Sequence, residues 1–337
     1  MPITNRVSEL FAMFECKTKL SASSFCLVLW LIVQTLAVNE TGRACLAEDP
    51  DLYVVVLGNA QDAGFPQSNC KKKCCRDAWS DPDKRRYATA IAVVDKSSRT
   101  KTLFECTPHF PNQIHLLDKL ENGEVANYQL NGIYLTHAHI GHYAGLIHLG
   151  REVEGAKGVP VHVMPRMREF LIGNGPWSQL VELKNISLRR LTADVEQQNG
   201  RIKVTPILVP HRDEFSETVG YRISSSNRSL LFLPDIDKWE KWKTRIEEQI
   251  SQVDYALLDG TFFDGNELPG RDMSRIPHPF VIESMKRFKT LKQSEKKKIH
   301  FIHLNHTNPL LQPDSKARKL LEGAGYRIAK QGQKIPL

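Results

Sequence analysis

The sequence of 337 residues has no internal repeats, no low-complexity tract and no arginine-rich arm. Basic residues are not interleaved with aromatic ones in the way nucleic-acid binders show, so we expect no nucleic-acid partner. The net charge is +8, and much of the excess comes from short lysine and arginine runs of the kind found on a solvated surface. The chain also lacks an apolar run of ~20 residues, the length that a membrane-spanning helix needs.

One shorter apolar run lies near the N-terminus, at residues 25–38. Three basic side chains precede it: Arg6, Lys17 and Lys19. A basic region, a short apolar run and the small residues that follow resemble a secretory signal. We therefore expect residues 1–47 to be a signal peptide or an N-terminal membrane anchor with its linker, and residues 48–337 to form one exported domain, periplasmic or secreted. An uncleaved anchor that associates with a membrane and a start at Met13 are the alternatives.

Cysteines are few and unevenly placed. The seven are Cys16, Cys26, Cys45, Cys70, Cys74, Cys75 and Cys106. An odd, clustered set favours metal binding over a disulfide framework, although an oxidising compartment would permit disulfides.

From residue 52 onward, short apolar runs alternate with turns. Runs rich in β-branched and aliphatic residues predict strands at 53–57, 88–94, 102–106, 132–135, 159–163, 187–191, 203–209, 219–223, 229–233, 255–258 and 299–303. Helices are predicted at 111–120, 142–149, 165–172, 238–252, 279–288 and 313–323. Strand pairs come first and helices are interleaved later, which predicts an α/β sandwich of two packed sheets with helices outside.

The strongest motif is a group of three histidines at the end of a predicted strand, where residues 134–145 read YLTHAHIGHYAG. His137 and His139 are two apart, so their imidazoles point the same way in an extended segment, and His142 can face back across them. Neutral imidazole is the commonest transition-metal ligand in proteins. We therefore predict a metal site here, with a loop of surface histidines as the alternative.

This segment resembles the H-x-H-x-D-H signature of the metallo-β-lactamase superfamily. The resemblance implies a four-layer αββα sandwich and one or two bound ions, zinc first, with iron or manganese as alternatives. Gly141 stands where the family has an aspartate that helps to bind the second ion. We expect that second site to be the weaker one, held by His142, Asp235 and His303, and we expect Gly141→Asp to tighten it.

The resemblance also implies further ligands at later strand ends. His211 matches the third histidine of the first site. Asp235 matches the carboxylate that links the two ions, whereas Asp237 is more typical of a helix cap. His303 matches the final histidine, with His306 as the alternative.

Several segments are similar to one branch of this superfamily, the pyrroloquinoline quinone biosynthesis B proteins. They are residues 57–70, 107–113, 259–261, 278–279 and 303–310. The branch implies a structural zinc ion bound by Cys70, Cys74 and Cys75. A fourth ligand would come from elsewhere, with His109 and Asp77 as candidates, because structural zinc takes four Cys or His ligands.

A zinc ion bound by three histidines with one open position lowers the pKa of its bound water to ~7. We therefore predict a hydrolase that uses a metal-bound hydroxide on an ester, amide or phosphodiester in a small molecule or peptide. Asp235 would bridge the ions or orient the nucleophile. Asp62 on the glycine-rich turn would accept a proton or a hydrogen bond from substrate, with a plain turn residue as its alternative. Asp259 and His278 are candidates for substrate contact or for support of the site residues from behind, and a turn role is an alternative for Asp259. The branch implies a different activity, that of an oxygenase or accessory protein in cofactor or peptide maturation, for which iron would also suit the ligands.

Overall fold

The computed structural model describes residues 50–337. The segment predicted to be a signal peptide or anchor, residues 1–47, lies outside the described residues, so export and the domain boundary stay predictions. Among residues 50–337, no helix combines the length and the apolar character that crossing a membrane requires.

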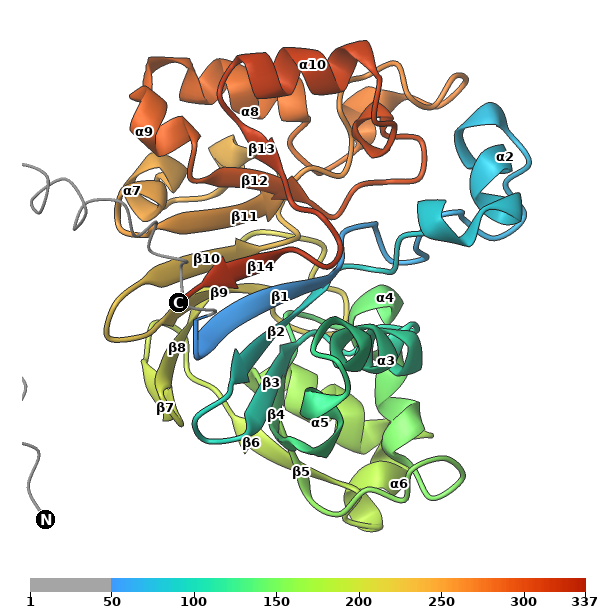
Figure 1. Cartoon of the computed structure of the whole chain (residues 1–337), viewed down its shortest axis with the longest axis vertical. Coiled ribbons are helices and arrows are strands. Elements are labelled where there is room, and N and C mark those ends of the chain that lie inside the picture. The colour runs from blue at the N-terminus through green and yellow to red at the C-terminus, as the bar shows by residue number, and fades with distance from the viewer. Residues whose placement is uncertain (1–49) are drawn as a thin grey trace, which may run out of the picture. The chain divides into compact units, whose positions relative to one another are not determined.

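Two seven-stranded mixed sheets lie at the centre of the described part (Figure 1). The first has the order β14-β1-β2-β3-β4-β5-β6, formed by β14 (Lys334–Pro336), β1 (Leu52–Gly58), β2 (Ala90–Asp95), β3 (Thr100–Phe104), β4 (Gln129–Tyr134), β5 (Val159–Val163) and β6 (Ile186–Arg190). The second has the order β13-β12-β11-β10-β9-β8-β7, formed by β13 (Arg327–Ile328), β12 (Ile299–Ile302), β11 (Tyr255–Asp259), β10 (Ser229–Leu233), β9 (Val219–Ser224), β8 (Ile202–Leu208) and β7 (Gln197–Asn199).

Helices lie outside the two sheets (Figure 1). Beside the first sheet are α3 (Phe110–Leu120), α4 (Ile140–Tyr143), α5 (Pro165–Gly173) and α6 (Trp177–Glu182). Beside the second are α7 (Ile246–Ser251), α8 (Val281–Arg287), α9 (Gln293–Lys296) and α10 (Lys316–Gly323). The helix α2 (Lys73–Ser80) projects to the side. Short 3₁₀ helices are η1 (Pro82–Lys84), η2 (Glu124–Asn127), η3 (Ala144–Leu149), η4 (Trp239–Lys241), η5 (Met273–Arg275), η6 (Phe288–Thr290) and η7 (Pro309–Leu311).

Successive side chains of the strands point to opposite faces of the sheet, and this alternation produces the layers. Tyr53 and Val55 of β1 pack with the apolar residues of α3, α5 and α6, whereas Val54 and Val56 point the other way, into the core between the sheets. A third core joins residues such as Phe301 to the helices of the second sheet. Three cores separate four layers, which confirms the predicted αββα sandwich.

All the predicted strands are present, with ends shifted by a few residues. The predicted helix at 238–252 is wrong in its first half, which is η4 followed by an extended segment before α7. The indole N–H of Trp242 donates to Leu208 O at 2.9 Å, and that of Trp239 donates to Ser284 Oγ at 2.9 Å. These tertiary bonds hold the segment out of a continuous helix. The strands β7, β13 and β14 were missed, because two or three residues are too few to show a period.

A buried histidine in β12 makes a testable contribution to stability. The side chain of His300 is 1% exposed, its Nδ1 lies 3.0 Å from Lys298 O, and burial lowers its pKa to about 4. The unfolded chain, with a histidine pKa of about 6.5, therefore binds the proton first as the pH falls, and stability is lost from about pH 6.5 downward. Between pH 7 and pH 5, we expect the free energy of unfolding to fall by roughly 2 kcal/mol more in the wild type than in His300→Gln. Denaturant unfolding of both proteins at the two pH values measures this, and equal falls would refute it.

Candidate metal centre

Segments that follow strands of both sheets converge at one edge of the sandwich. His137 follows β4, His211 follows β8, Asp235 follows β10 and His303 follows β12. Asp62 follows β1 in the same way. The fold therefore brings together residues that lie far apart in the sequence, as the resemblance implied.

These side chains form two clusters whose ligand atoms lie within 4.8 Å of one another. The first cluster is His137, His139, His211 and Asp235. The second cluster is Asp62, His142, Asp235 and His303. We call the two clusters together the histidine–aspartate centre; Asp235 belongs to both.

The carboxylate of Asp235 lies between the two sets of rings. Its Oδ2 is 3.2 Å from His142 Nε2, 3.4 Å from His303 Nε2 and 3.7 Å from His137 Nε2. Its Oδ1 is 3.4 Å from His211 Nε2. A buried carboxylate in this position can contribute an oxygen to an ion in either cluster.

The polar atoms at the centre fit metal ions. His137 Nε2, His142 Nε2, His211 Nε2 and Asp235 Oδ1 are all buried without a hydrogen-bond partner. Buried polar atoms normally have a hydrogen-bond partner, and atoms that bind a metal ion are a recognised exception. Imidazole nitrogens with carboxylate oxygens suit zinc, and also iron or manganese.

Neighbouring groups orient the imidazoles. Three Nδ1 atoms have an oxygen partner: that of His137 lies 2.8 Å from Thr136 Oγ1, that of His303 lies 2.9 Å from Thr261 Oγ1, and that of His211 lies 3.3 Å from Asp237 Oδ1. An acceptor at Nδ1 selects the tautomer whose Nε2 is free for an ion. The helix-cap interpretation of Asp237 is therefore corrected, since it contacts His211 and pairs with Lys241.

His139 is the most accessible of the five imidazoles of the centre. Its Nε2 lies 3.1 Å from Glu214 Oε2, which leaves Nδ1 as its free nitrogen. The first cluster therefore contains one partly exposed ring beside its buried ones.

Glu105 is a site residue that the sequence analysis missed. It is fully buried directly after β3, has a φ of 80°, and places Oε1 3.5 Å from His142 Nδ1. Burial raises the pKa of Glu105. Burial opposes the charged form of His142, but Glu105, followed by Asp235 and Asp62, raises the pKa of this imidazole well above its usual value. Its place after a strand, shared with the other site residues, was the only signal in the sequence.

His278 and Asp259, predicted to contact substrate or to support the site, differ in position. His278 lines a pocket beside the centre, and its Nδ1 lies 2.8 Å from Asp259 Oδ2 and 3.2 Å from Asp235 Oδ1. Burial lowers the pKa of His278, but Asp259 and Asp235 together raise it to about 9. Asp259 is fully buried and also accepts from Thr261 N and Oγ1, a position that fits support of the site from behind, one of its two predicted roles.

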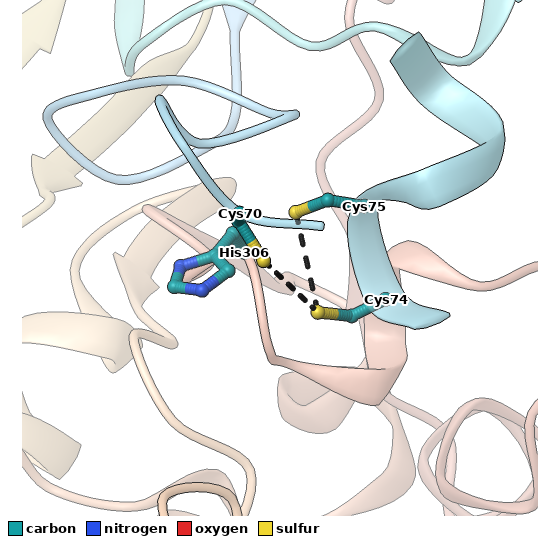
Figure 2. A group of neighbouring side chains, drawn as sticks. All are labelled: Cys70, Cys74, Cys75 and His306. Carbon is teal, nitrogen blue, oxygen red and sulfur yellow. Dashed lines mark hydrogen bonds between the residues drawn. The ribbon is translucent and has the colours of Figure 1, made fainter. Parts of the chain in front are cut away.

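His303 and His306, the two alternatives for the final histidine, lie in different clusters. His303 lies in the second cluster, with Nε2 3.3 Å from Asp62 Oδ1. His306 lies elsewhere, beside Cys70, Cys74 and Cys75, as Figure 2 shows. We call these four residues the cysteine cluster.

The cysteine cluster has the dimensions of a tetrahedral zinc site. The sulfur of Cys74 lies 3.8 Å from that of Cys70 and 4.0 Å from that of Cys75 (Figure 2). Zn–S bonds of about 2.3 Å in a tetrahedron place the sulfurs about 3.8 Å apart. The distances are too long for a disulfide. Among the described residues, His306 completes a set of four, so the suggested fourth ligands are wrong: His109 accepts from Ala88 N, and Asp77 is exposed beside Arg76.

The structure also corrects the expectation for position 141. A Cβ at Gly141 would lie 2.4 Å from Asp62 Cβ and 2.5 Å from Asp62 Cα, which is closer than real atoms approach. Gly141→Asp alone therefore cannot be accommodated without moving Asp62, and the expected tightening of the second site does not follow. Asp62, predicted at the rim of the site, lies within the second cluster.

A pocket of about 430 Å³ opens beside the centre. Its lining includes Asp62, Arg212, Phe262, Arg271 and His278. It offers room for a ligand that can reach the second cluster and His278 together.

Comparison with known proteins identifies the family of this chain. Residues 100–304 match the model of the beta-lactamase superfamily domain. The chain is 22% identical over 302 residues to coenzyme PQQ synthesis protein B of Methylorubrum extorquens (strain PA1), covering 85% of this chain and 100% of that protein. It is 24% identical over 310 residues to the protein of that name from Rhizobium meliloti (strain 1021), covering 85% and 98%.

Solved structures agree in fold. The Zn²⁺-bound PqqB from Methylobacterium extorquens aligns with a TM-score of 0.69 and 22% identity, over 85% of this chain and 100% of that one. A diphosphatase from the PhnP family aligns with a TM-score of 0.58 and 21% identity, over 84% and 96%. With its matching family model, its two facing sheets and its histidine–aspartate centre, this chain belongs to the metallo-β-lactamase superfamily and resembles PqqB.

Proposed function

We propose that this chain is a metal-dependent hydrolase that acts on an anionic ester, with a phosphodiester as the first candidate. The observation that carries the proposal is a buried carboxylate, Asp235, shared by two clusters of ligand atoms. Bound zinc would supply a Lewis acid and a water with a pKa near 7. The first cluster would hold one ion and the second cluster the other.

The chain's own residues would position the substrate and move its protons. His278 uses Nδ1 to contact Asp259 and Asp235, which leaves Nε2 for the pocket. From there it can donate a hydrogen bond or a proton to a substrate oxygen. Asp259 orients this ring, and Thr261 links Asp259 to His303.

The charge of the pocket supports an anionic substrate. Arg212 and Arg271 both line it, both are exposed, and neither guanidinium makes a hydrogen bond or ion pair with another residue of the described chain. Guanidinium groups bind phosphate oxygens through two parallel hydrogen bonds, so unpaired arginines beside a metal centre suit a phosphoryl group. The anionic group could belong to a small molecule or to a peptide. We also propose that residues 25–38 direct export of the chain.

We also propose that the cysteine cluster holds one structural zinc ion. Its four ligands match the number that closed structural sites use, and its sulfur spacing matches a tetrahedron. Such a site leaves no open position for substrate, so its role would be to fix α2 and the segment that contains His306.

A second candidate function is a metal-dependent oxygenase or accessory protein in cofactor or peptide maturation. Similarity to coenzyme PQQ synthesis protein B over its full length favours it. If the purified protein contains iron and consumes oxygen, this second function is favoured over the hydrolase.

The test is hydrolysis by the zinc-loaded protein of three model substrates: a nitrophenyl phosphodiester, a phosphomonoester and a neutral carboxylic ester. We expect metal-dependent cleavage of the phosphodiester. Arg212→Ala and Arg271→Ala should each raise its KM by about tenfold, because each removes one charge-assisted contact at a solvent-exposed position. Arg151→Ala, which removes an exposed arginine outside the pocket lining, is the matched control and should change nothing. Cleavage of the neutral ester alone, insensitive to both arginine variants, would contradict the proposed substrate class.

A further inference from the structure

The inference concerns the carboxylate of the second cluster, and it rests on the proposed metal-dependent function. Position 141, in α4 between two histidines of the motif, has no side chain. The space in front of its backbone is filled by Asp62, because a Cβ at Gly141 would come within 2.6 Å of Asp62 Oδ1 as well as within 2.5 Å of its backbone. One carboxylate therefore occupies the place that a side chain at 141 would need.

The turn that follows β1 places Asp62 at this position. Ala60 forms an isolated parallel bridge with Leu304, which joins the end of β1 to the end of β12. Gln61 N donates to Leu304 O at 2.9 Å, and Gly64 N donates back to Gln61 O at 2.7 Å. Asp62 thus lies in a short turn held directly beside His303.

The contacts of Asp62 are those of a ligand. Its Oδ1 is 3.0 Å from His142 Nε2 and 3.3 Å from His303 Nε2. The same two nitrogens lie 3.2 Å and 3.4 Å from Asp235 Oδ2. Two carboxylate oxygens and two imidazole nitrogens thus surround one point, with the side chain of Asp62 34% exposed toward solvent.

We infer that Asp62 is the second anionic ligand of the second ion, and that Gly141 serves this ligand by leaving room for it. The two positions form an exchangeable pair: a carboxylate can enter the second cluster from the turn after β1 or from α4, but not from both. A glycine at 141 is then as necessary for the second ion as the carboxylate at 62, although glycine itself binds nothing.

The test uses four variants of the full chain and measures zinc per chain after equilibration at fixed free zinc, together with the affinity of each ion. Asp62→Gly should lower the affinity of the second ion by at least ~100-fold and leave the first in place, since a direct ligand matters more than an outer contact, whose loss costs 10–100-fold. Gly141→Ala should do the same by pushing Asp62 aside. The exchange variant, Asp62→Gly with Gly141→Asp, should recover the second ion. Gly173→Ala, at the end of α5 where an added Cβ meets nothing within 4 Å, is the matched control and should bind as the wild type does.

Each outcome separates this inference from the function on which it rests. A wild type with no ion in the histidine–aspartate centre would overturn the proposed function. A wild type with two ions there, together with an Asp62→Gly variant that keeps both at unchanged affinity, would overturn only the role of Asp62. Loss of the second ion in Asp62→Gly but not in Gly141→Ala would overturn the role of Gly141. If the exchange variant fails to fold, the two single variants still decide between these results.

Discussion

Asp235→Asn is expected to lower hydrolysis by at least ~1,000-fold and to release both ions of the histidine–aspartate centre. Asparagine keeps the shape of the side chain but removes its negative charge and places an N–H₂ donor among imidazole nitrogens. Because Asp235 contributes to both clusters, no other single ligand should have so wide an effect. Metal analysis of the purified variant and initial rates at saturating zinc measure the two losses.

Asp237→Asn is the matched control for this prediction. Asp237 lies two positions further along the chain and contacts His211 Nδ1 at 3.3 Å, but it belongs to neither cluster. Loss of such an outer contact weakens metal binding by 10–100-fold, so high zinc should refill the first cluster and restore turnover. If folded Asp235→Asn keeps two ions in the centre, the shared-carboxylate arrangement is wrong.

Removal of the structural ion is expected to have the largest effect on stability. Cys75→Ser changes a fully buried ligand in the small core formed with Ala60 and Phe65. An ion present at about 1,000 times its dissociation constant stabilises the folded state by about 4 kcal/mol, so the melting temperature should fall by roughly 10 °C. The variant should also hold one zinc ion fewer per chain. Thermal unfolding and metal analysis test both expectations.

Cobalt substitution assigns that loss to the correct site. Cobalt bound by thiolates shows a sulfur-to-metal charge-transfer absorption, which the histidine–aspartate centre, with no sulfur ligand, cannot produce. We expect this absorption in the wild type and in Cys106→Ser, whose buried thiol lies outside the cluster. We expect it to be reduced in Cys75→Ser. A wild type that takes up cobalt without this absorption would reject the cysteine cluster as a metal site.

Much of the centre could be predicted from the sequence because its residues follow strands. His137, His211, Asp235 and His303 each come just after an apolar run, and segments that follow the strands of two facing sheets meet at one edge of the sandwich. Most strands could be predicted, because their apolar runs are as long as a typical strand. The predicted helix at 238–252 is wrong in its first half, because the helical periodicity of the sequence continues through Trp239 and Trp242, whose indoles donate to other elements.

The positions of His303 and His306 show what the periodicity of a sequence cannot predict. The backbone of His303 has a φ of 63°, in the left-handed region that side chains other than glycine rarely adopt. This turn of the chain directs His303 to the second cluster and His306 to the cysteine cluster. A pattern of residue types carries no information about such a local dihedral angle, so the sequence favoured His303 for its place at a strand end but kept His306 as the alternative.

The sequence by itself determined the αββα layering, the histidine motif and the carboxylate after β10, because burial and strand order follow from the pattern of neighbouring residues. Only the tertiary structure decided which carboxylate enters the second cluster, which histidine joins the cysteines, and that Glu105 supports His142. The physical reason is that these are contacts between segments brought together by sheet pairing. Asp62, from a different part of the chain, fills the space beside Gly141. A glycine in a sequence motif does not show which residue fills the space that a side chain there would take.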